Sequence, residues 1–262
     1  MMRRGAFFWS IVFILAGMLF LLDNLGLVDV NVGGVFWPLL LIAAGLWTLG
    51  GVLFRRSYKV ERLRVPLEGA RQARVRLNHA AGRLDIHSLS NKDTLIEGDF
   101  AGGVEFDTRR QGDRLQLCMR SLVQFFPFWG PGISLVWSLG LQRDIPLVLE
   151  LEMGANEAQV DLSEMKVSLL RLKSGASSTD LTLPADAGFT RVEVSSGAAS
   201  ITIRIPAGVA ARTQARSSLS SINVDTTSFP LSGYVYQAPD YETAANKVDL
   251  SVEMEVGSLT VG

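Results

Sequence analysis

The stretch VSSGAASITIRIPAG (residues 194–208) decides the fold, because it restates an earlier stretch, LKSGASSTDLTLPADAG (172–188). After the glycine of the later stretch, Ile201, Ile203 and Ile205 alternate with polar residues. An apolar residue at every second position is typical of a strand with one buried and one solvated face. The same alternation recurs in 74–87, 147–162 and 248–261. Most of the chain is therefore predicted to be β structure.

A short run of small residues, which we call an elbow, divides each repeated phrase into two halves. The elbows are HAAG (79–82), MGANEA (153–158), SGASS (174–178), SGAAS (196–200), SSLSS (217–221) and VGS (256–258). Their centres, Gly154, Gly175, Gly197, Ser218 and Gly257, are spaced by 21, 22, 21 and 39 residues. A period near 21 is typical of units that bury their apolar faces against one another. We predict a mainly β, stacked, β-solenoid-like domain over 74–262.

The N-terminal part of the chain is apolar enough to cross a membrane twice. Residues 6–22 and 35–54 form runs of 17 and 20 residues, with Ser10 and Thr48 as their only polar side chains. A helix of ~20 residues spans the ~30 Å hydrocarbon core of a bilayer. We predict a two-pass transmembrane hairpin over 1–56. The alternative, a cleaved signal peptide, lacks a small-x-small cleavage site after its apolar run.

Basic residues gather at both outer ends of this hairpin and are absent from its loop, residues 23–34. Because such residues mark the cytoplasmic side, we predict that both termini are cytoplasmic. Those after the second helix reach into a juxtamembrane linker over 57–73 and are expected to contact anionic lipid headgroups. Nucleic-acid binding is the alternative, which the net charge of −1 and the lack of interleaved aromatic residues disfavour. The basic residues in question are Arg55, Arg56, Lys59, Arg62 and Arg64.

Residues 121–142 form a further apolar segment, 22 residues long and without a charge. Proline and glycine at its centre disfavour a third transmembrane helix, although that alternative stays open. We interpret 113–121 and 133–142 as paired strands joined by an aromatic tip over 122–132. The tip is expected to contact the membrane interface or a partner protein, or to fold back onto the core. Its aromatic residues are Phe125, Phe126, Phe128 and Trp129.

No catalytic or metal-binding pattern is present in the sequence. The two histidines, His79 and His87, are not part of a ligand cluster, and His87 shares an outward strand face with charged neighbours. Cys118 alternates with apolar residues and is expected to face outward, and a single cysteine excludes a disulfide framework. Phosphate-binding and nucleophile-elbow motifs are absent. We therefore expect no enzymatic activity, no cofactor and no metal site.

Two parts of the chain resemble a known bacterial family. The stretch FILAGMLFLLDNLGLVDVNVGGVFWPLLLIAAGLWTLGG (13–51) is similar to the LiaI/LiaF-like transmembrane region. IPLVLELEMGANEAQVDLSEMKVSLLRLKSGASSTDLTLP (145–184) and YETAANKVDLSVEMEVGSLTVG (241–262) resemble the LiaF-like toast-rack β domain. The resemblance implies a multi-pass protein of the bacterial cytoplasmic (inner) membrane that acts in the cell-envelope stress response. LiaF-type members restrain a sensor histidine kinase of a two-component system, and the resemblance carries over no catalytic residue.

These observations lead to two hypotheses about function. In the first, the protein is a non-enzymatic regulator that contacts membrane lipids and a sensor histidine kinase or another membrane protein, but no nucleic acid. In the second, it is a membrane-tethered scaffold that self-assembles into a homo-oligomer through its strand edges. The acidic last strand, with Asp249, Glu253 and Glu255, is expected to lie at an edge and to oppose such pairing.

Overall fold

The computed structural model describes residues 60–122 and 135–262. Its strands are β1 (Val60–Pro66), β2 (Gln72–Leu89), β3 (Thr94–Ala101), β4 (Val104–Gln111), β5 (Arg114–Ser121), β6 (Val136–Gln142), β7 (Leu147–Asp161), β8 (Val167–Thr182), β9 (Phe189–Arg204), β10 (Ala210–Val224), β11 (Leu231–Ser232), β12 (Val235–Gln237) and β13 (Lys247–Val261). These ranges hold strands and turns only, which confirms the mainly β prediction for them. None of the described segments is a helix able to span a bilayer. The expected helices 6–22 and 35–54, and residues 123–132 of the expected tip, lie outside the described residues.

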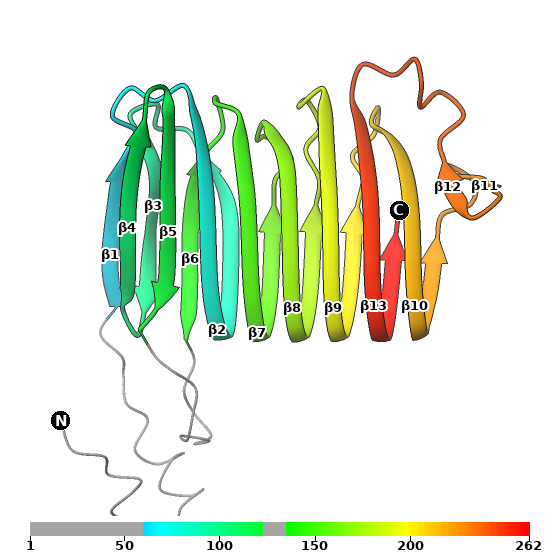
Figure 1. Ribbon diagram of the computed structural model, residues 1–262, viewed down its shortest axis with the longest axis horizontal. Coiled ribbons are helices and arrows are strands. Elements are labelled where there is room, and N and C mark those ends of the chain that lie inside the picture. The colour runs from blue at the N-terminus through cyan, green and yellow to red at the C-terminus, as the bar shows by residue number, and fades with distance from the viewer. Residues whose placement is uncertain (1–59, 123–134) are drawn as a thin grey trace, which may run out of the picture. The chain divides into compact units, whose positions relative to one another are not determined.

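Six long strands, β2, β7, β8, β9, β10 and β13, lie side by side as the rungs of a rack (Figure 1). Each turns back on itself at its elbow. We call the halves before the elbows the front layer and the halves after them the back layer. The two halves of β2 have different partners, because 72–78 pairs with β5 and 83–89 pairs with β6. One folded sheet therefore forms both layers.

The hydrophobic core lies between these two layers. Along β8, Leu170 and Leu172 of the front layer and Leu181 of the back layer are completely buried. Most residues between them are exposed, as the alternation predicted. Full burial of a leucine gains about 1.5–3 kcal/mol. Stacking therefore stabilises rungs that could not bury their inner faces alone.

The rungs do not stack in the order of the chain. They run β2, β7, β8, β9, β13 and β10, each parallel to the next. The C-terminal strand β13 is inserted between β9 and β10, with Ser258 opposite Ser200 on one side and Ser221 on the other. The expectation that this acidic strand lies at an edge is wrong. The last rung is β10.

The elbow centres stack in a column of close backbone contacts. A Cβ atom on Gly154 of β7 would lie 2.2 Å from the carbonyl oxygen of Ala80 in the neighbouring rung. Only glycine allows this approach. The column continues through Gly175 of β8 and Gly197 of β9. The prediction that Gly257 of β13 is the next member is wrong. There Val256 pairs with Ala198, so that Glu255 takes the position beside the glycine of β9.

Gly257 instead belongs to a second row, two residues further along the rungs. Its φ is 138°, and a Cβ atom on it would lie 1.8 Å from the carbonyl oxygen of Ala199. Gly82 of β2 occupies the same row with a φ of 119°, and its Cβ atom would lie 2.1 Å from the carbonyl oxygen of Leu135. β10 has serine in both rows, at Ser218 and Ser220. Each of the other five rungs has a glycine in one of the two rows.

At the β2 end of the rack, different strands extend the two layers. β5 and then β4 extend the front layer, while β6, β3 and β1 extend the back layer. The predicted pairing of 113–121 with 133–142 is therefore wrong, because β5 and β6 flank opposite halves of β2. Residues 60–66, expected within a linker over 57–73, form β1. Trp137 and Phe100 fill the core here, edge to face at 5.1 Å.

At the opposite end, β10 is covered only in part. The short strand β12 pairs with β10 at Arg212 and Thr213 alone, and β11 pairs with β12. The Arg212 guanidinium lies 2.9 Å from the Asp249 carboxylate and 4.8 Å from the centre of the Tyr241 ring. These contacts hold the connection between β10 and β13 over the part of β10 furthest from the elbow (Figure 1).

Candidate functional site: a polar groove across the rungs

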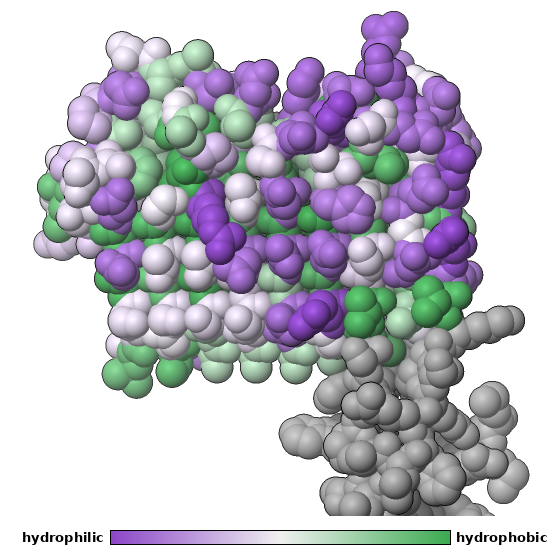
Figure 2. Space-filling view, turned by 180° about the vertical axis from the view of Figure 1, so that it is seen from behind, coloured by the Kyte–Doolittle hydropathy of each residue, from purple (hydrophilic) through white to green (hydrophobic). Residues whose placement is uncertain are grey.

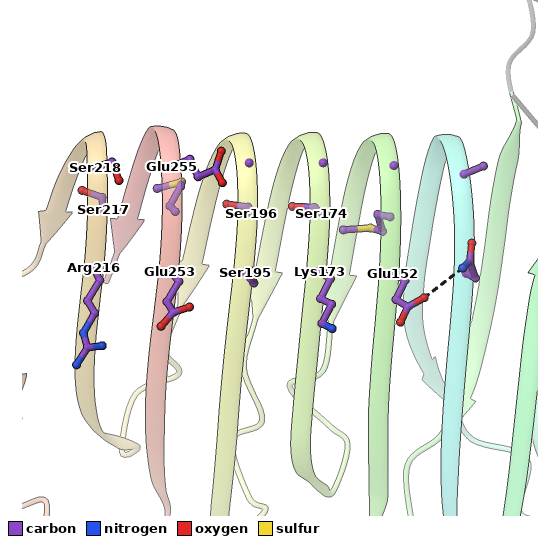
Figure 3. Close-up of a pocket in the computed structure, with 17 residues that line it drawn as sticks. Glu152, Lys173, Ser174, Ser195, Ser196, Arg216, Ser217, Ser218, Glu253 and Glu255 are labelled. Atoms are coloured by element: carbon purple, nitrogen blue, oxygen red, sulfur yellow. Dashed lines mark hydrogen bonds between the residues drawn. The ribbon is translucent and has the colours of Figure 1, made fainter. Parts of the chain in front are cut away.

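An open groove of about 840 Å³ crosses the front layer beside the elbows. Its outward side chains come from successive rungs and point the same way, as Figure 3 shows. Each lies two residues before the elbow position of its rung. We call this set the groove row, and its members are Asn78, Glu152, Lys173, Ser195, Glu253 and Arg216.

Parallel pairing places one groove-row residue on every rung. Glu152 is opposite Lys173, and Glu253 is opposite Arg216. At ~4.8 Å between strands, the row spans roughly 24 Å. Its two negative and two positive charges sum to zero. A row of alternating sign suits a partner surface of mixed charge better than it suits a polyanion.

The neighbouring outward row, two residues further from the elbow, is different because its charges are already paired. There the Arg171 and Glu193 side chains of adjacent rungs lie 2.7 Å apart, and a similar pair joins β2 to β7. The hydrogen bond to Glu193 raises the pKa of Arg171. Within the part of the chain that the structure describes, the groove row makes no ion pair. Its one side-chain hydrogen bond runs from Asn78 to Glu152, at 3.2 Å. The charges of the groove row are thus available to another molecule.

Small and unbranched side chains form the floor of the groove. Met153, Ser174, Ser196 and Met254 are all buried. Ser174 accepts a hydrogen bond from Ser177 at 3.0 Å. A nucleophilic serine requires a base within hydrogen-bond reach, and among the described residues none contacts these hydroxyl groups. Among the described residues, the floor serines therefore have no neighbour that would activate them as nucleophiles.

A buried polar cluster lies inside the core near the elbow of β2. The His79 ring is fully buried, contacts the Asn156 amide through Nδ1 and lies 4.8 Å from the Trp137 ring. Burial lowers the pKa of His79 from 6.5 to about 4. The ring is therefore neutral near pH 7. The buried His79 ring therefore fills space in the core. Because it must stay neutral there, the stability of the fold depends on pH.

Two of the basic residues expected beside the membrane lie on β1. Arg62 forms an ion pair with Asp99 at 2.9 Å, and Arg64 donates a hydrogen bond to the Thr94 hydroxyl at 2.9 Å. Both are thus held against β3. Contact of the expected site residues with lipid or a partner stays a prediction. Those outside the described residues are Arg55, Arg56, Lys59, Phe125, Phe126, Phe128 and Trp129.

The remaining candidates of the sequence do not form a site. Cys118 is half-buried between two fully inward residues of β5, which confirms its outward orientation. His87 is exposed. In residues 60–122 and 135–262, no three His, Cys, Asp or Glu side chains are arranged to hold a metal ion.

The groove row is the feature that sequence reasoning missed. A signal for it exists, because four of its members stand two residues before the predicted elbow centres Gly154, Gly175, Gly197 and Ser218. Glu253 breaks this rule relative to Gly257 and joins the row only through the register of β13.

Two family models match the chain. Residues 55–204 match the one described as the N-terminal domain of toast_rack, DUF2154. Residues 7–49 match the LiaI-LiaF-like transmembrane region. No curated protein matches the chain significantly.

Two solved structures are similar. One is a candidate cell adhesion protein from Clostridium sporogenes, with 21% identity and a TM-score of 0.72 over 78% of this chain and 98% of that one. The other is a candidate adhesin from Bacteroides fragilis, with 8% identity and a TM-score of 0.29 over 78% of this chain and 97% of that one. The first shows a shared fold. The second likeness is too low to carry an argument.

Proposed function

This chain belongs to the toast-rack family and carries a LiaI-LiaF-like transmembrane region, and from this premise we propose that it regulates a membrane partner in the bacterial envelope-stress response. The regulation is non-enzymatic and works by contact through the rack. The partner is a sensor histidine kinase or another membrane protein. Residues 60–122 and 135–262 present a surface of stacked strands, and the transmembrane region anchors the same chain to the membrane.

The observation that carries this proposal is the contrast between two neighbouring rows of the front layer. One row satisfies its charges internally, as Arg171 and Glu193 do. The groove row leaves Lys173, Glu253 and Arg216 without an ion pair among the described residues. Charged groups arranged in this way give specificity and orientation to a protein contact.

A charge reversal in the groove tests this proposal. Lys173→Glu reverses a positive charge of the groove row on the internal rung β8, where the lysine side chain is exposed. We expect at least a tenfold loss of the co-purified membrane partner and a changed response to cell-wall antibiotics. The matched control is Lys166→Glu, which alters an exposed lysine outside the groove and should leave both readouts unchanged.

The proposal fails if deletion of the gene leaves the antibiotic response unchanged and the detergent-solubilised chain captures no membrane protein. Equal effects of the groove variant and Lys166→Glu on the two readouts would mean that the groove is not the contact surface. The description of the fold would not change.

Cytoplasmic placement of the rack, with two membrane passes, belongs to the same proposal. Half-buried Cys118 is a poor reporter of it. Ser178 is exposed, so Cys118→Ser combined with Ser178→Cys gives a better one. A membrane-impermeant thiol reagent should label this chain in lysed cells only. Labelling in intact cells would place the rack outside and contradict contact with a cytoplasmic kinase domain.

A further inference from the structure

The free edge of β10 is the most unusual surface of the rack. From Gln214 to Val224, no described strand pairs with the side of β10 that faces away from β13. The unpaired edge runs along both layers and around the elbow. Backbone N–H and C=O groups in such an edge form a template for another strand.

This edge lacks the usual protection against pairing. Between Ser217 and Val224 it carries no charge and no proline. Leu219, at the elbow, is 78% exposed. Figure 2 shows hydrophobic groups along the line of elbows, and strongly hydrophobic ones lie at the β10 end. Natural proteins blunt exposed edges with charges, prolines or bulges, and an edge without them is typical of a contact surface.

The edge strands at the opposite end are protected in this way. Every residue of β4 after Val104 is exposed, and its charges are Glu105, Asp107, Arg109 and Arg110. On β1, Arg62 is paired with Asp99, and Pro66 ends the strand. Head-to-tail stacking of β10 onto this end would therefore place charged strands against an edge whose one charge is Arg216. Pairing of β10 with β10 avoids that mismatch.

The geometry points to a closed dimer in which two copies of this chain join through their β10 edges. The chain reverses direction at the elbow, so the two halves of β10 run in opposite directions. A two-fold axis through the elbow, perpendicular to the stacking direction, exchanges the front and back layers. It sets the front half of one β10 antiparallel to the back half of the other.

The inward and outward alternation of β10 is compatible with this pairing. With Ser218 opposite Leu219 of the second copy, Ala215 lies opposite Ile222, and both point inward. In the same register Arg216 lies opposite Ser221, and both point outward. The pairing extends the core across the axis, brings no like charges together and places the two exposed Leu219 side chains near each other. It forms on both layers at once, so the dimer closes and does not polymerise.

Particle mass tests this inference on the full chain in detergent, by light scattering corrected for the micelle. The wild-type chain is expected at twice its monomer mass. Ser221→Lys puts a lysine opposite Arg216 twice per dimer and should give a monomer with an unchanged circular dichroism spectrum. The matched control is Ser178→Lys, which lies in the same row on the internal rung β8 and should remain dimeric.

Disulfide formation gives a second readout that does not depend on Ser221. In a Cys118→Ser background, Leu219→Cys should form a disulfide-linked dimer in native membranes, whereas Ser178→Cys should not. A monomeric wild-type chain, a dimeric Ser221→Lys chain or an open series of higher masses would each overturn the inference. None of these results bears on the regulatory contact of the groove, which its own charge variant tests.

Discussion

The two ends of the rack terminate the same stack of rungs in different ways. At the β2 end, additional strands extend both layers, the outermost strands carry charges, and Trp137 fills the core with no exposed area. At the β10 end, serine occupies both glycine rows, inward residues such as Ala215 and Ile222 are only half-buried, and the edge carries almost no charge. The β2 end is therefore closed by additional charged strands. The β10 end has the composition of a contact surface.

The largest expected difference between the ends concerns the core. Trp137→Ala should lower the free energy of unfolding by about 3–5 kcal/mol, because it leaves a large cavity beside Phe100. Ile222→Ala should cost about 1–2 kcal/mol, because its side chain is smaller than that of Trp137 and only half-buried within one chain. Urea unfolding of the full chain in detergent, followed by circular dichroism, measures both. Equal losses would mean that the β10 end is as well packed as the other.

The elbows give a smaller but more closely matched comparison, since Gly82 and Ser220 occupy the same row at opposite ends. Gly82→Ala should cost about 3 kcal/mol, from its positive φ and from the close carbonyl oxygen of Leu135. Ser220→Ala should be neutral or slightly stabilising, because the Ser220 hydroxyl is buried without a partner among the described residues. Thermal unfolding of the two variants would show similar shifts if the elbows at both ends were equally crowded.

The third difference depends on pH, because His79 is buried at the β2 end. Its folded pKa of about 4 lies below its unfolded value of 6.5. The unfolded state therefore binds a proton first as the pH falls, and stability is lost between about pH 6.5 and 4. At pH 5 the loss should be about 2 kcal/mol relative to pH 7. His79→Gln should remove most of this loss. An unchanged pH profile in the variant would assign the dependence to other groups.

The sequence predicts the local structure of the rungs because alternation is a local property. Ile201 and Ile203 point inward on β9, as their spacing requires, and the small residues at the elbows mark where each strand turns. What alternation does not specify is which rung lies beside which. All rungs present similar faces, so β13 can pair as well with β9 as β10 could.

The same reasoning explains the errors at the β2 end. β5 and β6 follow one another in the chain, and consecutive strands commonly pair as a hairpin, so the sequence predicts that they pair. Instead each pairs with a different half of β2, a strand long enough to belong to both layers. The groove row was missed for a related reason, because its charges become neighbours only when the rungs stack.

The insertion of β13 between β9 and β10 is the central claim, since it makes β10 the edge of the rack. Two cysteine pairs in a Cys118→Ser background test it directly by oxidation of the folded chain. Ser200→Cys with Ser258→Cys should form a disulfide, because the two hydroxyl oxygens lie 3.0 Å apart. Ser200→Cys with Ser221→Cys should not, because the intervening rung separates them by roughly 10 Å. A disulfide in the second pair but not in the first would mean that the rungs follow the order of the chain, and it would contradict the account.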